Sequence, residues 1–469
     1  MTVPALMEHQ KEGVAFLLER RAGLLAFEQG LGKTLVAIEA FVRARREGDT
    51  QRLLVICPNS LKRNWQAELT KFAPDLDVTI VEGSRAVRRG QFASARTAVV
   101  ITSYETARNE VTPILALLQR MPTAMVLDES HATKNKESLT STAAQHFAPL
   151  ATHRWLLSGT PVTNSPADLF TQIDIVAPGE RPLGSFEMFL ADTQDRAGAE
   201  AMRSRLSRFL LRRTKEQCLD LPDKIFVDVR VELPAWQRAL YDEMRSEMVC
   251  AIQAMTGEEY RAFASTALAQ LVRLSQIASN PSLLFPDCGK TPGKFEEMDH
   301  LVSEILNEPN RKVIIWSSYV RTIEQLVERY RAHGAVALYG AVPNEDRQSI
   351  AAQFQSNTGA RVLIANPAAA GSGFTLTAAT YSIYESLSWR YDYYAQSQDR
   401  NHRIGQMLPV TYLRMIAADT IEEVIVAALE RKSSMARTLL GDEDAPPRIA
   451  DFTRAQMCAL ILRNELPSG

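Results

Sequence analysis

The stretch AFEQGLGKTLVA, residues 26–37, joins a short apolar run to a glycine turn and then to a helix-forming segment. A loop that binds phosphate needs free backbone N–H groups, a lysine that reaches the β and γ phosphates, and a hydroxyl that holds Mg²⁺. The residues that offer these groups are Gly30, Leu31, Gly32, Lys33 and Thr34. Phe27, however, occupies the position at which the general pattern G-x-x-x-x-G-K-[ST] has its first glycine. The stretch therefore predicts either a phosphate-binding loop or a glycine turn before an ordinary amphipathic helix.

The size and composition of the chain limit its possible functions. A chain of 469 residues is longer than one typical core supports, so we expect two or three domains. The 53 lysines and arginines nearly balance the 55 aspartates and glutamates, so net charge argues neither for nor against nucleic acid. The sequence shows no secretory signal and no run as long as a membrane span, which predicts an intracellular protein. The cysteines form no C-x-x-C pair and are expected to be free thiols: Cys57, Cys218, Cys250, Cys288 and Cys458.

The first half of the chain repeats one pattern, a short apolar run followed at once by a polar or glycine-containing cluster. Such runs are typical of buried strands in a parallel sheet. They cover residues 23–29, 52–60, 98–105, 123–131 and 154–161. Ligands of open α/β sheets bind beyond the carboxyl ends of the strands, where all of these clusters lie. The pattern therefore predicts that the clusters share one crevice.

The same pattern returns after a middle segment of helical periodicity, from about Asp168 to Leu284. The later apolar runs cover residues 312–318, 336–340, 361–367, 381–387 and 409–417. Glycine and proline in residues 285–294 indicate a hinge between two α/β lobes, and the residues after Gly441 indicate a link to one last helix. We therefore expect an α/β protein with a first lobe at 1–220, a helical linker at 221–293, a second lobe at 294–440 and a tail at 441–469.

Two adjacent acidic residues, Asp128 and Glu129, come at the end of a predicted strand. Such a pair suits a division of labour in which one carboxylate holds Mg²⁺ and the other accepts a proton from an attacking water. Acidic pairs also end strands merely because they are solvated. The glycine loop upstream makes the catalytic interpretation the stronger one.

Positive charge for a transferred phosphoryl group is predicted in the second lobe. Gln396, Arg400 and Arg403 are spaced at i, i+4 and i+7, which predicts one face of a helix. Two arginines at that spacing are usually a solvated face, but as arginine fingers they would stabilise charge at the γ phosphate of ATP. Because they lie in the other lobe from the glycine loop, they would reach ATP only when the lobes close.

An ordered series of motifs resembles the Swi/Snf ATPases of the superfamily-two helicase-like translocases. LMEHQKEGVAFLL (6–18) is similar to their adenine-reading segment, and EQGLGKT (28–34) to their motif I, whose usual form also lacks the first glycine of the general pattern. The other matches are CPNSLKRNWQAE (57–68), ITSYE (101–105), DESH (128–131), LSGTPVTNSPADLF (157–170), LLRRTKEQCLDLPDK (210–224), LVRLSQIASNP (271–281), KVIIWSSY (312–319), AAGSGFTLTAA (369–379) and DRNHRIGQ (399–406). Departures from the family pattern fall at Phe27, at Gln29, at Asn366-Pro367 and at residues 372–374.

The resemblance implies two RecA-like lobes with parallel sheets and helical insertions between them, and it implies a role for each matching residue. Gln10 would read adenine, the loop residues 30–34 and Gly373 would bind the nucleotide, and Thr34 with Asp128 would hold Mg²⁺. Lys33, Asp128, Glu129, Arg400 and Arg403 would be catalytic. Ser158, Thr160 and Gln396 would couple the nucleotide state to DNA.

Contacts with DNA are expected from hydroxyl, amide and basic groups, because sequence-independent binding relies on phosphates. The family places such groups at Ser60, Lys62, Asn64, Thr102, Ser103, Ser317, Gly371, Gly373 and Thr375. The alternative for each Ser or Thr is a helix cap. The basic run 203–215 predicts a helix with its leucines on the core and its arginines outward, either as a DNA patch or as a solvated face. Trp65 is spaced with Leu61 and Leu69 as a packing residue rather than a base-stacking one.

The expected function is that of a double-stranded-DNA-stimulated ATPase that uses ATP and Mg²⁺ to translocate on duplex DNA and to remodel DNA or protein–DNA complexes. One alternative is a strand-separating or annealing helicase at forks. Another is an ATP-gated DNA-binding or recruitment module with low turnover. The expected partners are duplex or forked DNA and a targeting protein, and the chain is expected to act as a monomer in a bacterial or phage cytoplasmic setting.

Overall fold

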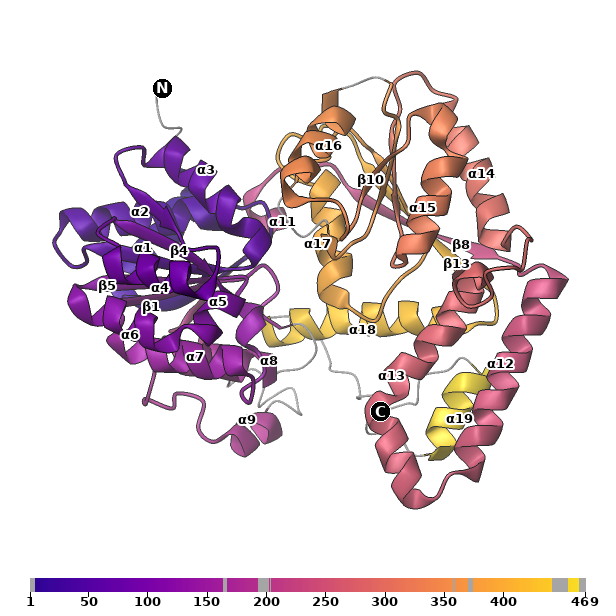
Figure 1. Ribbon diagram of the computed structural model, residues 1–469, viewed down its shortest axis with the longest axis horizontal. Helices are drawn as coiled ribbons and strands as arrows, with labels where there is room; N and C mark the ends of the chain where they lie inside the picture. The colour runs from indigo at the N-terminus through magenta and orange to yellow at the C-terminus, as the bar shows by residue number, and fades with distance from the viewer. Residues whose placement is uncertain are drawn as a thin grey trace. The chain divides into compact units, whose positions relative to one another are not determined.

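The structure is a computed structural model that describes residues 5–162, 167–192, 202, 204–356, 359–369, 374–440 and 454–463. The chain divides into two compact units, whose main segments are Met1–Asp220 and Leu221–Ser433. Each unit is built around its own parallel sheet with many helices (Figure 1), so the predicted α/β fold class is confirmed. Among the described residues no helix is long and apolar enough to cross a membrane.

The first unit has a seven-stranded sheet. Its strand order is β3 (Val78–Ile80), β4 (Val99–Ser103), β2 (Arg52–Cys57), β5 (Thr123–Asp128), β6 (His153–Leu157), β1 (Ala22–Phe27) and β7 (Leu210–Arg213). The helices of this unit are α1 (Glu8–Arg20), α2 (Lys33–Arg46), α3 (Lys62–Phe72), α4 (Arg85–Ser94), α5 (Tyr104–Asn109), α6 (Val111–Arg120), α7 (Leu139–Phe147), α8 (Ala167–Val176), α9 (Phe186–Asp192) and α11 (Lys215–Cys218).

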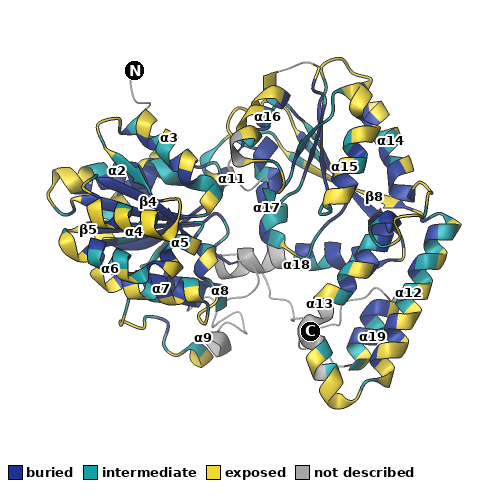
Figure 2. Cartoon of the chain, in the orientation of Figure 1, coloured by how far each residue is buried: buried dark blue, intermediate teal, exposed yellow. Residues whose placement is uncertain are grey.

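The central strands of this sheet are buried on both faces. In β2, Leu54 and Ile56 belong to one apolar cluster, whereas Leu53 and Val55 belong to another. Successive side chains of a strand point to opposite faces, so the two clusters lie on opposite sides of the sheet. Figure 2 shows buried strands beneath helices whose outer surfaces are exposed. Double-sided burial explains why these strands read as continuous apolar runs in the sequence.

The second unit has a six-stranded sheet. Its strand order is β10 (Val336–Leu338), β11 (Val362–Ala365), β9 (Val313–Trp316), β12 (Tyr381–Tyr384), β13 (Val410–Ala417) and β8 (Lys224–Val231). The helices from Leu221 onward are α12 (Ala235–Ala254), α13 (Gly257–Ser279), α14 (Gly293–Leu306), α15 (Val320–Arg329), α16 (Asn344–Ser356), α17 (Tyr391–Asn401), α18 (Ile421–Leu440) and α19 (Arg454–Arg463). Residues of α12, α13 and α19 share an apolar cluster.

Part of the basic run 203–215 is a strand and not the expected helix. Leu210–Arg213 form β7, which pairs in parallel with β1, so that Leu210 lies opposite Leu24. The free edge of β1 offers backbone partners that outweigh the helical preference of the local sequence. Within this strand Arg212 lies 3.6 Å from Glu28, and Arg213 Nε donates to Glu12 (3.0 Å). These two arginines are therefore paired with acidic residues rather than free for DNA.

The region expected to be a helical linker also contains a strand. β8 pairs in parallel with β13 over eight residues, from Lys224 opposite Val410 to Val231 opposite Ala417. The second unit thus begins at Leu221, and the glycine- and proline-rich residues 285–294 lie inside it. The hinge that was expected there is not where the chain passes from one unit to the other. The five cysteines are free, as expected.

Candidate nucleotide-binding site and DNA-contacting residues

The glycine loop connects β1, which ends at Phe27, to α2, which begins at Lys33. Gly30 (φ 89°) and Gly32 (φ 81°) have left-handed backbone conformations, which glycine adopts most readily. A Cβ at position 32 would lie only 2.5 Å from Nε2 of Gln10. The loop therefore turns on these two glycines and leads into the N-terminus of a helix, where free N–H groups attract anions.

Lys33 is buried and is held by the loop itself. Its Nζ donates to the carbonyl oxygens of Phe27 (2.9 Å) and Glu28 (3.5 Å). The side chain of Phe27 is fully buried, and its ring meets that of His9 edge-on at 5.7 Å. Position 27 thus contributes a core side chain and a carbonyl oxygen, while the turn is made further along. This geometry favours the phosphate-binding loop over a simple glycine turn.

Gln10 and His9 of α1 contact the same loop. The amide Nε2 of Gln10 donates to the carbonyl of Leu31 (3.3 Å), and Nε2 of His9 lies 3.0 Å from that oxygen. His9 also lines a hollow of about 560 Å³. Its lining comes from two segments, Met7, Glu8, His9 and Glu12 on one side and Arg213, Gln217, Cys218, Leu219 and Asp220 on the other. Gln10, the expected adenine-reading residue, is not among the residues that line this hollow.

Asp128 ends β5, and both of its carboxylate oxygens accept hydrogen bonds. Oδ1 accepts from the N–H of Glu129 (2.9 Å), and Oδ2 accepts from the indole Nε1 of Trp65 (2.8 Å). Burial, followed by the negative charge of Glu129, raises the pKa of Asp128 to about 6, although Trp65 and the charge of Lys33 oppose this shift. The Asp128 backbone carbonyl accepts from the hydroxyl of Tyr104 (2.8 Å).

Trp65 is therefore a neighbour of the candidate site that was not predicted from the sequence. Its spacing with Leu61 and Leu69 correctly placed it in the core, since it is fully buried. The same spacing said nothing about the indole N–H, whose acceptor lies 63 residues away in the chain. Because a buried tryptophan usually needs a hydrogen-bond acceptor for its indole N–H, its burial alone indicates that Trp65 has a polar partner.

Glu129 has a strained backbone. Its φ of 51° and ψ of 53° lie in the left-handed region, which residues other than glycine rarely adopt. Its carboxylate lies near two side chains, with Gln29 Nε2 3.5 Å from Oε1 and His131 Nδ1 3.3 Å from Oε2. In this backbone conformation the carboxylate lies next to the loop residue Gln29.

The chemistry of Asp128 fits a magnesium ion. Mg²⁺ prefers hard oxygen ligands, and Asp128 offers a carboxylate at the end of β5, while Thr34, the second residue of α2, offers a hydroxyl directly after the glycine loop. Each Asp128 oxygen accepts one hydrogen bond and so retains acceptor capacity. These two residues would hold the ion.

The segment after β6 lies against the glycine loop. A Cβ at Gly159 would come within 2.9 Å of Gln29 Cγ and within 3.4 Å of Lys33 Nζ, so only glycine permits this approach. The hydroxyl of Ser158, which is fully buried, accepts from the N–H of Thr160 (3.2 Å). Both predicted coupling residues are thus adjacent to the phosphate loop.

A second residue that the sequence analysis missed is Gln172 of α8. Its Oε1 accepts from the hydroxyl of Ser130 (2.7 Å), and its Nε2 donates to the carbonyl of Pro161 (2.7 Å). Gln172 thereby joins the DESH segment to the LSGTP segment. No spacing in the sequence marked it.

The predicted arginines lie at the end of α17 in the second unit. Gln396 and Arg400 are on the helix and buried, but α17 ends at Asn401, so Arg403 lies beyond it and not on the expected helix face. The side chain of Gln406 explains the ending, because its Nε2 donates to the carbonyl of Asn401 (3.0 Å). Arg403 Nη1 donates to the carbonyl of Phe374 (3.3 Å).

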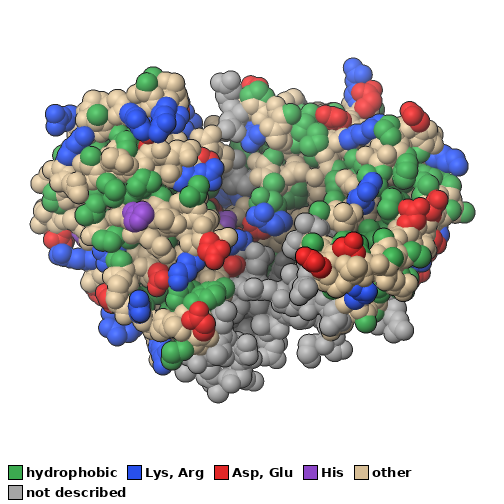
Figure 3. Space-filling view, turned by 60° about the horizontal axis from the view of Figure 1, so that its bottom comes forward, with side chains coloured by type: hydrophobic (Ala, Val, Ile, Leu, Met, Phe, Trp, Pro, Cys, Tyr) green, Lys and Arg blue, Asp and Glu red, His purple; other side chains and the backbone are tan. Residues whose placement is uncertain are grey.

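Burial divides the candidate DNA-contacting residues. Thr102 and Ser317 are fully buried, Ser103 is buried and caps α5 through the N–H of Thr106 (3.2 Å), and Lys62 is buried and lies 3.6 Å from Glu82. The side chains of these four residues are therefore buried in this structure, and their contact with DNA stays a prediction. Those that remain accessible are Ser60, Asn64 and Thr375. Gly371 and Gly373 lie outside the described residues. On the face that Figure 3 shows, both units carry lysine and arginine as well as aspartate and glutamate.

Two family models match the chain, the SNF2-related domain over residues 9–283 and the helicase conserved C-terminal domain over residues 293–405. The chain belongs to the SNF2-related family. The resemblance to Swi/Snf ATPases is thereby confirmed, and the two matched domains indicate ATP hydrolysis. The pair of parallel-sheet units corresponds to the expected two RecA-like lobes.

Similar proteins occur in bacteria and in eukaryotes. The "Putative ATP-dependent helicase/translocase YwqA" of Bacillus subtilis is 30% identical over 94% of this chain and 49% of that protein. An uncharacterized ATP-dependent helicase of Mycoplasma pneumoniae is 30% identical, with 94% and 43% covered. The Sulfolobus solfataricus SWI2/SNF2 ATPase core, solved in complex with dsDNA, is 26% identical over 94% of this chain and 98% of that one, with a TM-score of 0.44. The chain spans about half the length or less of these two bacterial relatives.

Within this SNF2-related chain, the two departures in motif I have structural roles. Phe27 provides the carbonyl that holds Lys33, and Gln29 lies between Glu129 and Gly159. Both positions therefore belong to the site, although neither side chain is the usual one.

Proposed function

We propose that the chain is a DNA-stimulated ATPase that translocates along duplex DNA and remodels DNA or protein–DNA complexes. The observation that carries the proposal is the gathering of Lys33, Asp128 and Glu129 around a loop of phosphate-binding geometry. The bacterial relatives, which are named as a helicase and a helicase/translocase, support a motor function and a bacterial or phage setting.

The arrangement around the loop can carry out hydrolysis. The base of ATP would lie beside Gln10, and its phosphates would accept from the N–H groups of residues 30–34. Lys33 would exchange carbonyl partners for phosphate oxygens, which carry full charge and are the better acceptors. Glu129 would take a proton from the attacking water. When bound, Mg²⁺ would neutralise charge on the phosphates.

The second unit would supply the remaining positive charge. We propose Arg400 and Arg403 as arginine fingers at the γ phosphate, with Gln396, Ser158 and Thr160 as coupling residues. Hydrolysis would then require both units to engage one ATP, which links turnover to movement on DNA. Phosphate contacts would come from the accessible hydroxyl and amide groups of Ser60, Asn64 and Thr375, and a partner protein would direct the chain to its target.

The test is steady-state ATP hydrolysis with no nucleic acid, with single-stranded DNA, with duplex DNA and with forked DNA. We expect strong stimulation by duplex or forked DNA. Glu129→Gln should bind ATP but lose most turnover, whereas Glu137→Gln, at an exposed glutamate, should behave as the wild type. Stimulation by single strands alone would instead indicate a strand-separating helicase. An absence of hydrolysis under every condition would indicate an ATP-gated binding module.

A further inference from the structure

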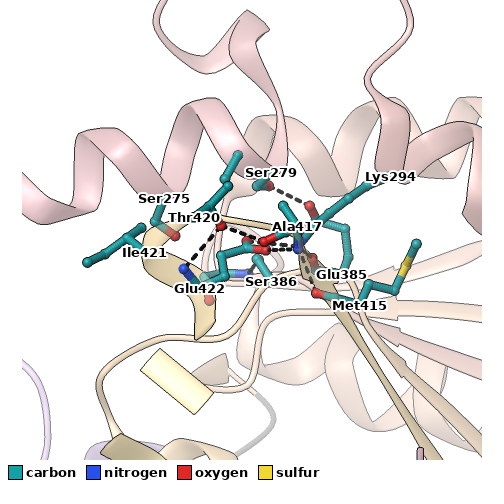
Figure 4. Close-up of polar contacts among 12 residues, drawn as sticks. Ser275, Ser279, Lys294, Glu385, Ser386, Met415, Ala417, Thr420, Ile421 and Glu422 are labelled. Carbon is teal, nitrogen blue, oxygen red and sulfur yellow. Dashed lines mark hydrogen bonds and ion pairs between the residues drawn. The ribbon is translucent and has the colours of Figure 1, made fainter. Parts of the chain in front are cut away.

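A buried cluster of charged and hydroxyl side chains lies at the strand ends of the second unit (Figure 4). At its centre is Lys294 of α14, which is fully buried. Its Nζ donates to the carbonyls of Glu385 (2.5 Å) and Met415 (2.9 Å) and to Oε1 of Glu422 (2.8 Å). Oε2 of Glu422 accepts from the N–H of Ala417 (2.8 Å). Lys294 therefore ties the ends of β12 and β13 to the start of α18.

Glu385 connects this cluster to two further elements. It directly follows β12 and is fully buried. Its Oε2 accepts from the hydroxyl of Ser317 (2.7 Å), and its Oε1 accepts from the hydroxyl of Ser279. Ser317 comes just after β9, whereas Ser279 ends α13. One carboxylate thus joins the helical segment α13 to the loop after β9.

Polar side chains bond to the backbone of each residue in the loop Ser317–Tyr319, in addition to its backbone hydrogen bonds. The hydroxyl of Ser317 accepts from the N–H of Tyr319 (3.3 Å), and that of Ser386 accepts from the N–H of Ser318 (2.9 Å). Asn366 Nδ2 donates to the carbonyls of Ser317 (3.3 Å) and Ser318 (3.1 Å). This asparagine is one of the departures from the family's usual motif V.

The same loop has its own contact with α13. The hydroxyl of Tyr319 donates to that of Ser275 (3.1 Å). Ser318 and Tyr319 are half-buried, and they lead directly into the N-terminus of α15, which begins at Val320. The accessible face of the loop is therefore the start of a helix, a place that favours phosphate.

A buried carboxylate that accepts hydrogen bonds from two serines stabilises a core less than apolar side chains of similar size would. Removing charge from water is costly, and apolar residues of similar size often stabilise a core better than buried ions do. Hydrogen bonds from hydroxyls to a carboxylate are strong and directional, so they fix the serine side chains. The arrangement is better explained by the precise shape it imposes on the loop.

We propose that Glu385 is a positioning residue that holds the loop Ser317–Tyr319 in shape for phosphate contact and couples this loop to α13. The inference rests on the proposed function, because the loop lies in the segment similar to the family's motif IV. It assigns to the buried Ser317 an indirect role, in which its hydroxyl transmits the position of Glu385 to the backbone of Tyr319. A movement of α13 would reach the loop through both Ser279 and Ser275.

The test compares Glu385→Gln with Glu422→Gln. Both variants neutralise a buried glutamate of one cluster, but only Glu385 contacts the loop. Hydrogen exchange of the peptide that contains residues 317–319, measured without DNA, should become at least about tenfold faster in Glu385→Gln and should stay within about twofold in Glu422→Gln. The duplex DNA concentration for half-maximal ATPase stimulation should rise about tenfold in Glu385→Gln alone, with the rate at saturating DNA nearly kept.

A double-mutant cycle with Ser317→Ala completes the test. If Glu385 acts through Ser317, Glu385→Gln should change DNA affinity little further in the Ser317→Ala background. Equal effects of the two glutamine variants, or a full additional effect on top of Ser317→Ala, would overturn the inference. A wild type that no DNA stimulates would refute the proposed function, and the exchange measurement would still decide whether Glu385 holds the loop.

Discussion

Each unit contains a cluster in which one buried lysine lies with two acidic side chains, but the two clusters are connected in different ways. In the site cluster of Lys33, Asp128 and Glu129, the lysine donates to two carbonyl oxygens. In the core cluster of Lys294, Glu385 and Glu422, the lysine donates to a carboxylate as well as to two carbonyls. Lys33 thus donates to uncharged carbonyl groups in the first unit, whereas Lys294 in the second unit donates to a carboxylate as well.

The difference shows how to tell a reactive buried lysine from a structural one. Carbonyl oxygens satisfy the Lys33 ammonium without neutralising it, so its charge remains available to a phosphate. The Glu422 carboxylate neutralises Lys294, and both are needed to satisfy each other in the core. Burial acts on both clusters, because it raises the pKa of Asp128 and also that of Glu422. The connections, and not the burial, distinguish the site.

The site cluster of Lys33, Asp128 and Glu129 contains one basic side chain, so under the proposed function the largest effect is expected from the arginines that would add positive charge. Arg403→Ala should lower DNA-stimulated turnover on the order of 10³-fold or more, as loss of an arginine finger does. Single-turnover hydrolysis with saturating ATP would measure this. Arg347→Ala, which removes an arginine on α16 that bonds to Gly340 and Val342, is the matched control. A loss below tenfold would leave the role to Arg400.

Exchanging each buried lysine for methionine tests the comparison directly. Lys33→Met should lower turnover by about 10²–10³-fold, as loss of one charge-stabilising group does, with little change in the free energy of unfolding. Lys294→Met should do the reverse, because it leaves Glu422 buried without its partner, which costs about 3–5 kcal/mol. Hydrolysis rates and urea unfolding curves would separate the two. Similar losses of stability in both variants would contradict the contrast between the clusters.

Trp65→Phe should weaken the site cluster by a smaller amount. The indole hydrogen bond favours the charged form of Asp128, so its loss should raise the pKa of Asp128 above about 6. A hydrogen bond to a charged group contributes about 1.5–3 kcal/mol, so the Mg²⁺ requirement for turnover should rise about tenfold or more near pH 6.5 and by less at pH 8. Trp155→Phe is the control, because that buried indole donates to the carbonyl of Leu17 (3.2 Å). A shift that is equal at both pH values would argue for lost packing alone.

The smallest expected effect concerns stability at low pH in the first unit. Burial lowers the pKa of His153, at the start of β6, to about 4. Between that pKa and its unfolded value near 6.5 the unfolded chain binds the additional proton, so stability should fall as the pH falls from about 6.5 to about 4. In His153→Gln the unfolding midpoint in urea should depend less on pH. His146→Gln, on an exposed position of α7, should leave the dependence unchanged.

Most of the fold could be predicted because both sheets bury their central strands on two sides. The apolar runs at 52–60, 123–131 and 312–318, for example, contain β2, β5 and β9. Three strands escaped prediction, β3, β7 and β8, and each lies at an edge of its sheet. β3 is only three residues long, whereas β7 and β8 carry arginine, lysine or aspartate, since an edge strand is only partly buried. Pairing with β4, β1 or β13 is what makes them strands, and such pairing is not visible locally.

The site could be predicted only as a list of residues and not as a set of contacts. Gly30, Gly32 and Lys33 follow from the chemistry of phosphate binding, and Asp128 follows from its place at a strand end. The bond from Trp65 to Asp128 and the bridge formed by Gln172 depend on tertiary structure. Burial, which depends on the packing of both sheet faces, also decided which hydroxyl candidates are accessible.

Helix α3 gives this site a mechanical consequence. Asn64, an accessible candidate for phosphate contact, and Trp65, the donor to Asp128, are neighbours on its first turn, and Ser60 precedes them. Because a helix is stiff, a small shift of the Asp128 carboxylate would move Trp65 and, with it, the first turn of α3. Under the proposed function, Asp128 at the nucleotide site and Asn64 at the DNA would be separated by only one hydrogen bond and less than one turn of helix.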